Sequence, residues 1–144
     1  MQTKTLKTVA YWLTTGLLAF DFGIGGIFHI TRAPAVMTGM AHLGYPTYFV
    51  TLLGVWKVLA GIALIAPRFP RLKEWAYAGI FFDLTGAAVS LLAVGDGVSK
   101  ALIPVVFMAF TLLSYALRPH GRTWSLAAQP ERARAEASLA TVSV

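Results

Sequence analysis

The sequence predicts an all-α integral membrane protein, a left-handed four-helix up-down bundle with a short interfacial helix between the first two spans. Composition is the first reason: the 144 residues are 57% hydrophobic and only 12% charged, whereas soluble domains are roughly one-quarter charged. The second is length, because four apolar runs each approach the ~20 residues that cross ~30 Å of hydrocarbon. The third is backbone satisfaction, since a chain in lipid must pair its own N–H and C=O groups.

The first apolar run, residues 9–30, is too long for a signal-peptide core and contains Asp21, so we expect a retained span. The connection that follows, residues 31–46, is the longest between spans. Pro34 can open a helix at its first turn, and Gly44 can close it. The residues between them make an apolar face, which predicts a short helix at or in the membrane surface.

The remaining three spans end at prolines or glycines, residues that stop a helix. The expected spans are residues 48–66, 75–94 and 101–117, and their stops are Pro67 to Pro70, Gly95 to Gly97 and Arg118-Pro119. We therefore expect a transmembrane domain over residues 1–118. Residues 119–144 are expected to form a mobile cytoplasmic tail.

The net charge of +6 reflects membrane topology. Nine lysines and arginines flank the spans on the side of the two termini, and two flank them on the other side. The positive-inside rule then places both termini in the cytoplasm. Nucleic-acid binding is not expected, because the basic residues are scattered over span ends. The absence of cysteine excludes thiolate catalysis, disulfide exchange and thiolate metal sites carried by this chain.

Three ionisable residues lie within the spans: Asp21, Lys57 and Asp83. An unpaired charge at the bilayer centre costs about 2.5–3.5 kcal/mol on insertion scales. Counting along the alternating helix directions places all three within roughly one helical turn of the membrane centre. Small residues surround each on its helix face, which directs that face into the bundle. We expect the opposite charges to meet there.

This arrangement has two interpretations. Lys57 can bridge Asp21 or Asp83 and serve only to lock the packing. Two carboxylates and one ammonium do not balance, however, so the second carboxylate must be protonated, find other donors or face water. The sharper hypothesis is a central cavity in which the second aspartate binds or protonates a ligand. Asp21 and Asp83 are then also the candidates for acid or base catalysis.

Three further residues are candidate ligand contacts. His29 ends the first span and His42 lies in the long connection, where each can bond to backbone or water, or to a quinone carbonyl. No acidic or sulfur ligand accompanies them, so no metal site is expected. Trp56, beside Lys57, can stack on an aromatic ligand or simply fill space.

The chain resembles the DoxX-like family of small bacterial four-helix membrane proteins over about residues 10–118. The segments that carry the resemblance are the glycine-rich sequence 23–30, the sequence His42 to Pro46, the sequence 53–64 around Trp56-Lys57, and the sequence 83–87. The chain departs from the common family pattern at His29, where relatives often carry lysine, and at Lys57, where they often carry glutamate.

The resemblance implies a bacterial inner-membrane protein associated with redox systems. From it we expect an accessory subunit that binds a quinone or another lipophilic molecule and contacts a redox partner protein. A proton-coupled small-molecule transporter, a membrane enzyme that acts on a lipophilic substrate and a ligand-free scaffold remain alternatives. Homo-oligomerisation also remains open.

Overall fold

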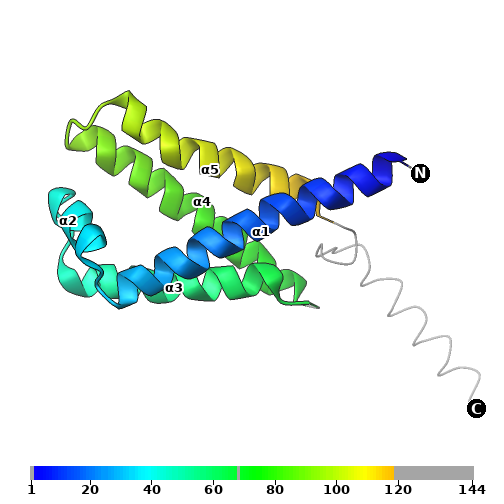
Figure 1. Ribbon diagram of the computed structural model, residues 1–144, viewed down its shortest axis with the longest axis horizontal. Helices are drawn as coiled ribbons and strands as arrows, with labels where there is room; N and C mark the ends of the chain where they lie inside the picture. Colours follow the sequence, from blue (N-terminus) through cyan, green and yellow to red (C-terminus); the bar gives the residue numbers. More distant parts are fainter. Residues whose placement is uncertain (1, 68, 119–144) are drawn as a thin grey trace, which may run out of the picture.

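The computed structural model describes residues 2–67 and 69–118, and these residues confirm the predicted all-α membrane fold (Figure 1). The described part of the chain contains five helices: α1 (Gln2–Ile30), α2 (Pro34–His42), α3 (Thr47–Ile65), α4 (Pro70–Ala93) and α5 (Val98–Ala116). Four of them, all except α2, are long and apolar enough to cross a membrane. The tail predicted over residues 119–144 lies outside the described residues.

Two helices begin at least five residues earlier than the apolar runs suggested. α1 begins at Gln2 and α4 at Pro70, whereas the apolar runs begin near residues 9 and 75. Hydrophobicity marks only the part of a helix that hydrocarbon surrounds, and polar residues continue the same hydrogen-bonded ladder beyond it. The predicted short helix is present as α2, with Pro34 at its first turn, where the missing N–H costs no hydrogen bond.

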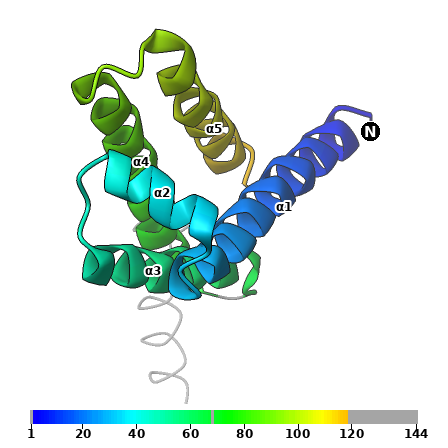
Figure 2. The same ribbon diagram turned by 60° about the vertical axis from the view of Figure 1, so that its left-hand side comes forward.

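The four long helices form a ring in which α1 and α4 lie on opposite corners. α1 packs against α3 and α5, and α4 packs against the same two helices. At the end of the bundle that carries α2, here called the α2 end, the α4–α5 pair lies away from α1 and α3 (Figures 1 and 2). Figure 2 shows α2 lying across the front of this separation.

The contact between α1 and α3 is close because glycines meet there. A Cβ atom built on Gly54 would lie 2.8 Å from the carbonyl oxygen of Gly26, and one built on Gly26 would lie 2.8 Å from the carbonyl oxygen of Gly54. Only glycine allows two helix backbones to approach in this way. Gly61 makes a similar, slightly looser contact about two helical turns further along α3. A Cβ atom built on Gly61 would lie 3.1 Å from the carbonyl oxygen of Ala19.

The buried apolar core extends from the middle of the bundle toward the opposite end, called here the terminal end because α1 begins and α5 finishes there. Leu18 and Phe22 of α1, Leu64 of α3, and Tyr77 and Ile80 of α4 are at most 3% exposed. Large side chains therefore fill the terminal part of the bundle.

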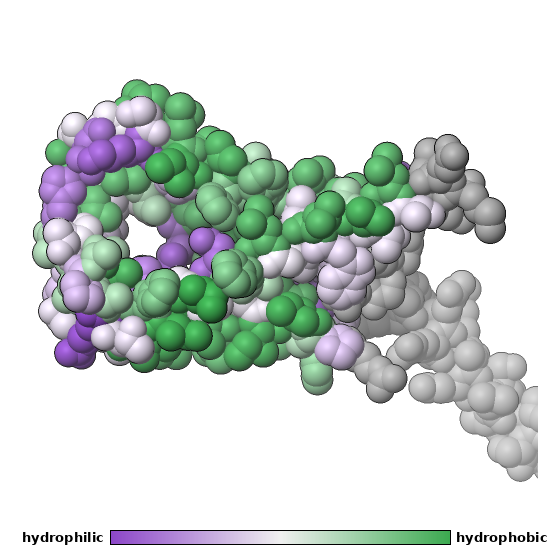
Figure 3. Space-filling view, viewed as in Figure 1, coloured by the Kyte–Doolittle hydropathy of each residue, from purple (hydrophilic) through white to green (hydrophobic). Residues whose placement is uncertain are grey.

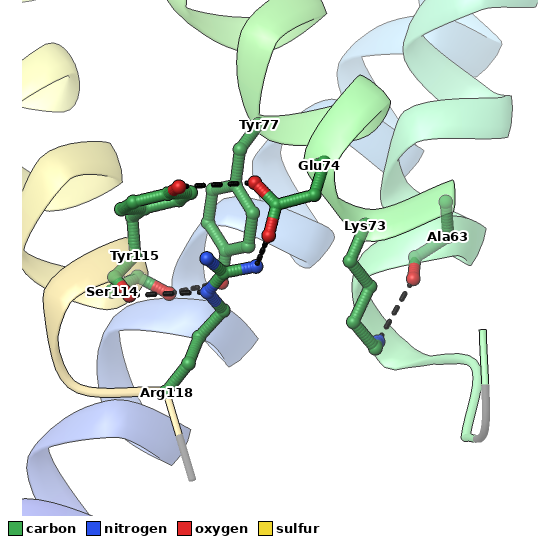
Figure 4. A network of polar contacts seen from close by, with 7 residues as sticks. All are labelled: Ala63, Lys73, Glu74, Tyr77, Ser114, Tyr115 and Arg118. Atoms are coloured by element: carbon green, nitrogen blue, oxygen red, sulfur yellow. Dashed lines mark hydrogen bonds and ion pairs between the residues drawn. The ribbon is translucent and has the colours of Figure 1, made fainter. Parts of the chain in front are cut away.

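A hydroxyl cluster lies beside this core. The hydroxyl oxygen of Ser114 on α5 is 2.7 Å from that of Thr15 on α1. It is 2.8 Å from that of Tyr77 on α4 (Figure 4). All three side chains are buried. The cluster connects three helices where α1 and α4 do not pack directly.

Two basic residues counted in the topology prediction are buried at the terminal end. Lys73 is fully buried, and its ammonium donates to the carbonyl oxygen of Ala63 at 3.0 Å (Figure 4). It also donates to the carbonyl oxygen of Leu64. These carbonyls belong to the last turn of α3, which has no intrahelical donors for them. Lys73 thus caps α3 from the neighbouring helix.

Arg118, the second of these basic residues, pairs with Glu74 at 2.8 Å, and the Glu74 carboxylate also accepts from the hydroxyl of Tyr115 at 3.0 Å (Figure 4). The guanidinium lies 3.8 Å from the centre of the Tyr115 ring. These contacts join the end of α5 to the start of α4.

Candidate functional site

Lys57 of α3 and Asp83 of α4 meet in the middle of the bundle. The ammonium nitrogen lies 3.1 Å from a carboxylate oxygen, and the two side chains are 18% and 14% exposed. Lys57 is placed three residues from Gly54 and four from Gly61, so it shares the helix face that packs inward. Its ammonium also lies 4.8 Å from the centre of the Phe22 ring. The expected meeting of opposite charges is confirmed for this pair.

Asp21 is not part of that ion pair. It is exposed, and its side chain makes no hydrogen bond or ion pair with residues 2–67 or 69–118. It nevertheless lies within electrostatic range of both Lys57 and Asp83. The structure therefore assigns the one ammonium to Asp83 and leaves the carboxyl of Asp21 as the surplus acid.

Asp21 lines a crevice between α1, α4 and α5 with a volume of about 320 Å³. Its other walls are apolar apart from Lys100, and they consist of Leu84, Ala87, Leu91, Ile103, Pro104 and Phe107. The lining runs from Leu84 to Leu91 on α4 and from Lys100 to Phe107 on α5. Each stretch is seven residue steps, which corresponds to a length of about 10 Å. The crevice thus connects the middle of the bundle with the α2 end.

The surface at the α2 end is open. Figure 3 shows an opening through the molecule there, with hydrophilic residues in purple along its margin toward the bundle centre. Most of the surrounding surface is hydrophobic, as expected for side chains that face lipid. Polar groups inside a membrane-embedded bundle usually face its interior or a water-filled cavity.

His29 belongs to the same region. Its Nδ1 lies 2.6 Å from the carbonyl oxygen of Gly25, and the ring is within electrostatic range of Lys57 and Asp83. Because a carbonyl only accepts hydrogen bonds, Nδ1 carries the proton, and Nε2 of the neutral ring is left as an acceptor.

His42 lies elsewhere, at the rim of the α2 end. Its Nε2 is 3.0 Å from a carboxylate oxygen of Asp96, and the same oxygen lies 3.0 Å from the ammonium of Lys100. Nearby, the hydroxyl of Tyr45 bonds that of Ser90 at 2.7 Å. These two contacts tie the connection that contains α2 to the α4–α5 pair. Sequence reasoning missed this tether, since nothing local predicts a contact between residues 54 positions apart.

Trp56 points away from the charged pair. It is 62% exposed on α3, as expected for a ring that faces lipid. The predicted contact residues therefore separate: Asp21, His29, Lys57 and Asp83 gather near the bundle centre, His42 lies at the rim, and Trp56 lies outside. Within residues 2–67 and 69–118, no group of three potential metal-ligating side chains occurs.

The four apolar spans and the charged centre define the class: this is a small, multi-pass integral membrane protein. Its sequence matches the family model of the DoxX-like family over residues 13–114, and the chain belongs to that family. The match covers all of α2 to α4 and most of α1 and α5. No curated protein and no solved structure matches the chain.

Proposed function

We propose that this protein is an accessory subunit of a bacterial inner-membrane redox system and binds a quinone or another lipophilic molecule at its polar centre. The observation that carries the proposal is the Lys57–Asp83 pair, which lies inside the membrane-spanning bundle and is still partly exposed. A ligand with a polar head and an apolar body suits such a place, because binding sites combine apolar walls with a few well-placed polar groups.

The chemistry of the surrounding groups suits a quinone head. The ammonium of Lys57 has donors beyond the one directed at Asp83 and can supply one to a carbonyl oxygen. In the neutral ring of His29, Nε2 can accept a hydrogen bond from a hydroxyl group of the reduced form. The chain has no cysteine, so electrons would have to pass between the ligand and a partner protein.

The distribution of basic residues supports an orientation with both termini in the cytoplasm. The α2 end then faces the opposite side of the membrane. A ligand or partner protein would reach the crevice from that side or from the bilayer.

A proton-coupled small-molecule transporter is the second candidate. It is favoured by Asp21, an exposed carboxyl group in the middle of a span that has no ion-pair partner among the described residues. Intramembrane carboxyl groups commonly serve in proton relays.

Native purification followed by lipid extraction tests the quinone proposal. The protein is extracted in nanodiscs from quinone-containing membranes, and quinone per protein is measured by mass spectrometry. Wild type should exceed an unrelated four-span protein, and Lys57→Met should lose the excess. Leu59→Met, on the exposed side of α3, is the matched control and should keep it. A wild-type ratio equal to that of the unrelated protein would refute quinone binding.

A further inference from the structure

We propose that the crevice beside Asp21 binds an amphiphilic organic cation, with its charge at the Asp21 carboxylate and its apolar body between α4 and α5. This goes beyond the proposed quinone site, which relies on donors at Lys57 and requires no charge on the ligand. The charge balance at the bundle centre, the exposure of Asp21 and the chemistry of the crevice walls support this site.

The ionisable side chains at the bundle centre carry one more negative charge than positive charge. With Asp21, Lys57 and Asp83 all ionised, the three side chains carry a net charge of −1. The ammonium of Lys57 lies 3.1 Å from Asp83, so Asp21 is the acid that has no ion-pair partner among the described residues. A carboxylate in a medium of low polarity must acquire a proton or a cation.

The nearest basic residue on the crevice wall does not fill this role. Lys100 lines the crevice at its α2 end, but its ammonium is 3.0 Å from the Asp96 carboxylate. His29 donates its Nδ1–H to the Gly25 carbonyl, so in the neutral form of the ring Nε2 is an acceptor and not a donor. Among the described residues, no cation therefore forms a direct ion pair with Asp21.

Access is open because Asp21 itself is exposed and forms part of the wall. At about 320 Å³, the crevice lies at the small end of the range of ligand sites. Its length of about 10 Å matches a chain of roughly eight carbons or a small aromatic body.

The walls select an organic cation over a metal ion. Magnesium and calcium require about six oxygen ligands, and Asp21 is the one carboxylate among the residues that line the crevice. The remaining lining is mainly aliphatic, with the ring of Phe107 on α5. Apolar walls favour a hydrocarbon body, and an aromatic face attracts an ammonium group.

Binding of two probes with the same chain and opposite charge tests the proposal. Octyltrimethylammonium and octanesulfonate are titrated into wild-type protein in nanodiscs of zwitterionic lipid, and binding to empty nanodiscs is subtracted. The cation should bind saturably with one site per chain, and the anion should show no saturable binding. Equal behaviour of the two probes would show lipid partitioning and overturn the site.

Variants separate charge from shape. Asp21→Asn should weaken cation binding at least about tenfold, and Asp21→Glu should restore much of it. Ala87→Phe fills the crevice without altering any charge and should abolish saturable binding. Val89→Phe, at similar depth on the exposed side of α4, is its control and should bind like wild type. Unchanged binding in Asp21→Asn, or in Ala87→Phe, contradicts the proposal even if quinone binding is established.

Discussion

The ammonium nitrogen of Lys57 lies 3.1 Å from a carboxylate oxygen of Asp83, and the two residues come from different membrane-spanning helices, α3 and α4. α3 and α4 are consecutive long helices joined by a short connection. The pair therefore links the two helices in the middle of the membrane-spanning bundle. Its partial exposure places it at the edge of the open region and not inside the apolar core.

Breaking this pair should cost more than removing it. Lys57→Met leaves the carboxylate of Asp83 without its counter-ion and should lower the free energy of unfolding by about 3 kcal/mol, the low end of the range for buried pairs. Lys57→Met combined with Asp83→Leu should recover most of that loss. Reversible unfolding in mixed detergent micelles measures both, with Leu59→Met as control. Additive losses in the double variant would show that the residues do not interact.

The glycine contact between α1 and α3 should tolerate no added methyl group. Gly54→Ala would place a Cβ atom 2.8 Å from backbone atoms of Gly26 and Ile30, so the helices must separate at a cost of about 1–3 kcal/mol. Gly16→Ala on α1 is the control, because nothing lies within 4 Å of its Cβ position. It should be neutral or stabilising by up to about 1 kcal/mol. Equal effects on unfolding would argue against close packing.

The hydroxyl cluster at Ser114 should stabilise the terminal end of the bundle. Ser114→Ala removes the hydrogen-bond partner of two buried hydroxyls, those of Thr15 and Tyr77. The expected loss is about 1–3 kcal/mol, the cost of a buried polar group that loses its partner. Ser99→Ala, at an exposed position on α5, should change the unfolding free energy by less than about 0.5 kcal/mol. A silent Ser114→Ala would contradict the assigned contacts.

Asp96 should make stability depend on pH only in acid. Hydrogen bonds from Lys100 and then His42 hold the pKa of the Asp96 carboxyl below its ordinary value of 3.8. A carboxyl group with a depressed pKa stabilises the folded state above its unfolded pKa and loses this contribution as pH falls through the folded pKa. The difference in melting temperature between wild type and Asp96→Asn should therefore persist at about pH 5 and shrink below about pH 3.8. Its disappearance above pH 5 would contradict the tether.

The spans were predictable because hydrocarbon imposes a simple rule on composition and length. Prolines and glycines located most helix ends, and Pro34 located the start of α2. The beginnings of α1 and α4 were not predictable, because the mainly polar segments 2–8 and 70–74 continue each helix without a hydrophobic signal. The close packing of α1 against α3 was indicated only by the glycines on the face of α3 that carries Lys57. The sequence of α3 alone does not show which helix packs against those glycines.

The candidate site was predictable in part. Counting residues along the spans placed Lys57 and Asp83 at the same depth. Depth alone does not show which of the two aspartates forms the ion pair with Lys57. That choice depends on the order of helices around the ring, in which α3 contacts both α1 and α4. The sequence did not predict the contact of Lys73 with the end of α3 or that of Arg118 with Glu74. Basic residues at span ends also satisfy the positive-inside rule, which already explained their positions.

The proposed binding sites require water and ligands to reach the charged centre through the crevice. Because the chain has no cysteine, single cysteines can be labelled without background. Ala87→Cys lies in the crevice wall, and Val89→Cys lies at similar depth on the exposed, lipid-facing side of α4. Reaction of both with a charged, membrane-impermeant methanethiosulfonate in sealed vesicles should label Ala87→Cys from one side and leave Val89→Cys unmodified. Equal protection of the two cysteines would show that the centre is sealed from water and would contradict the account.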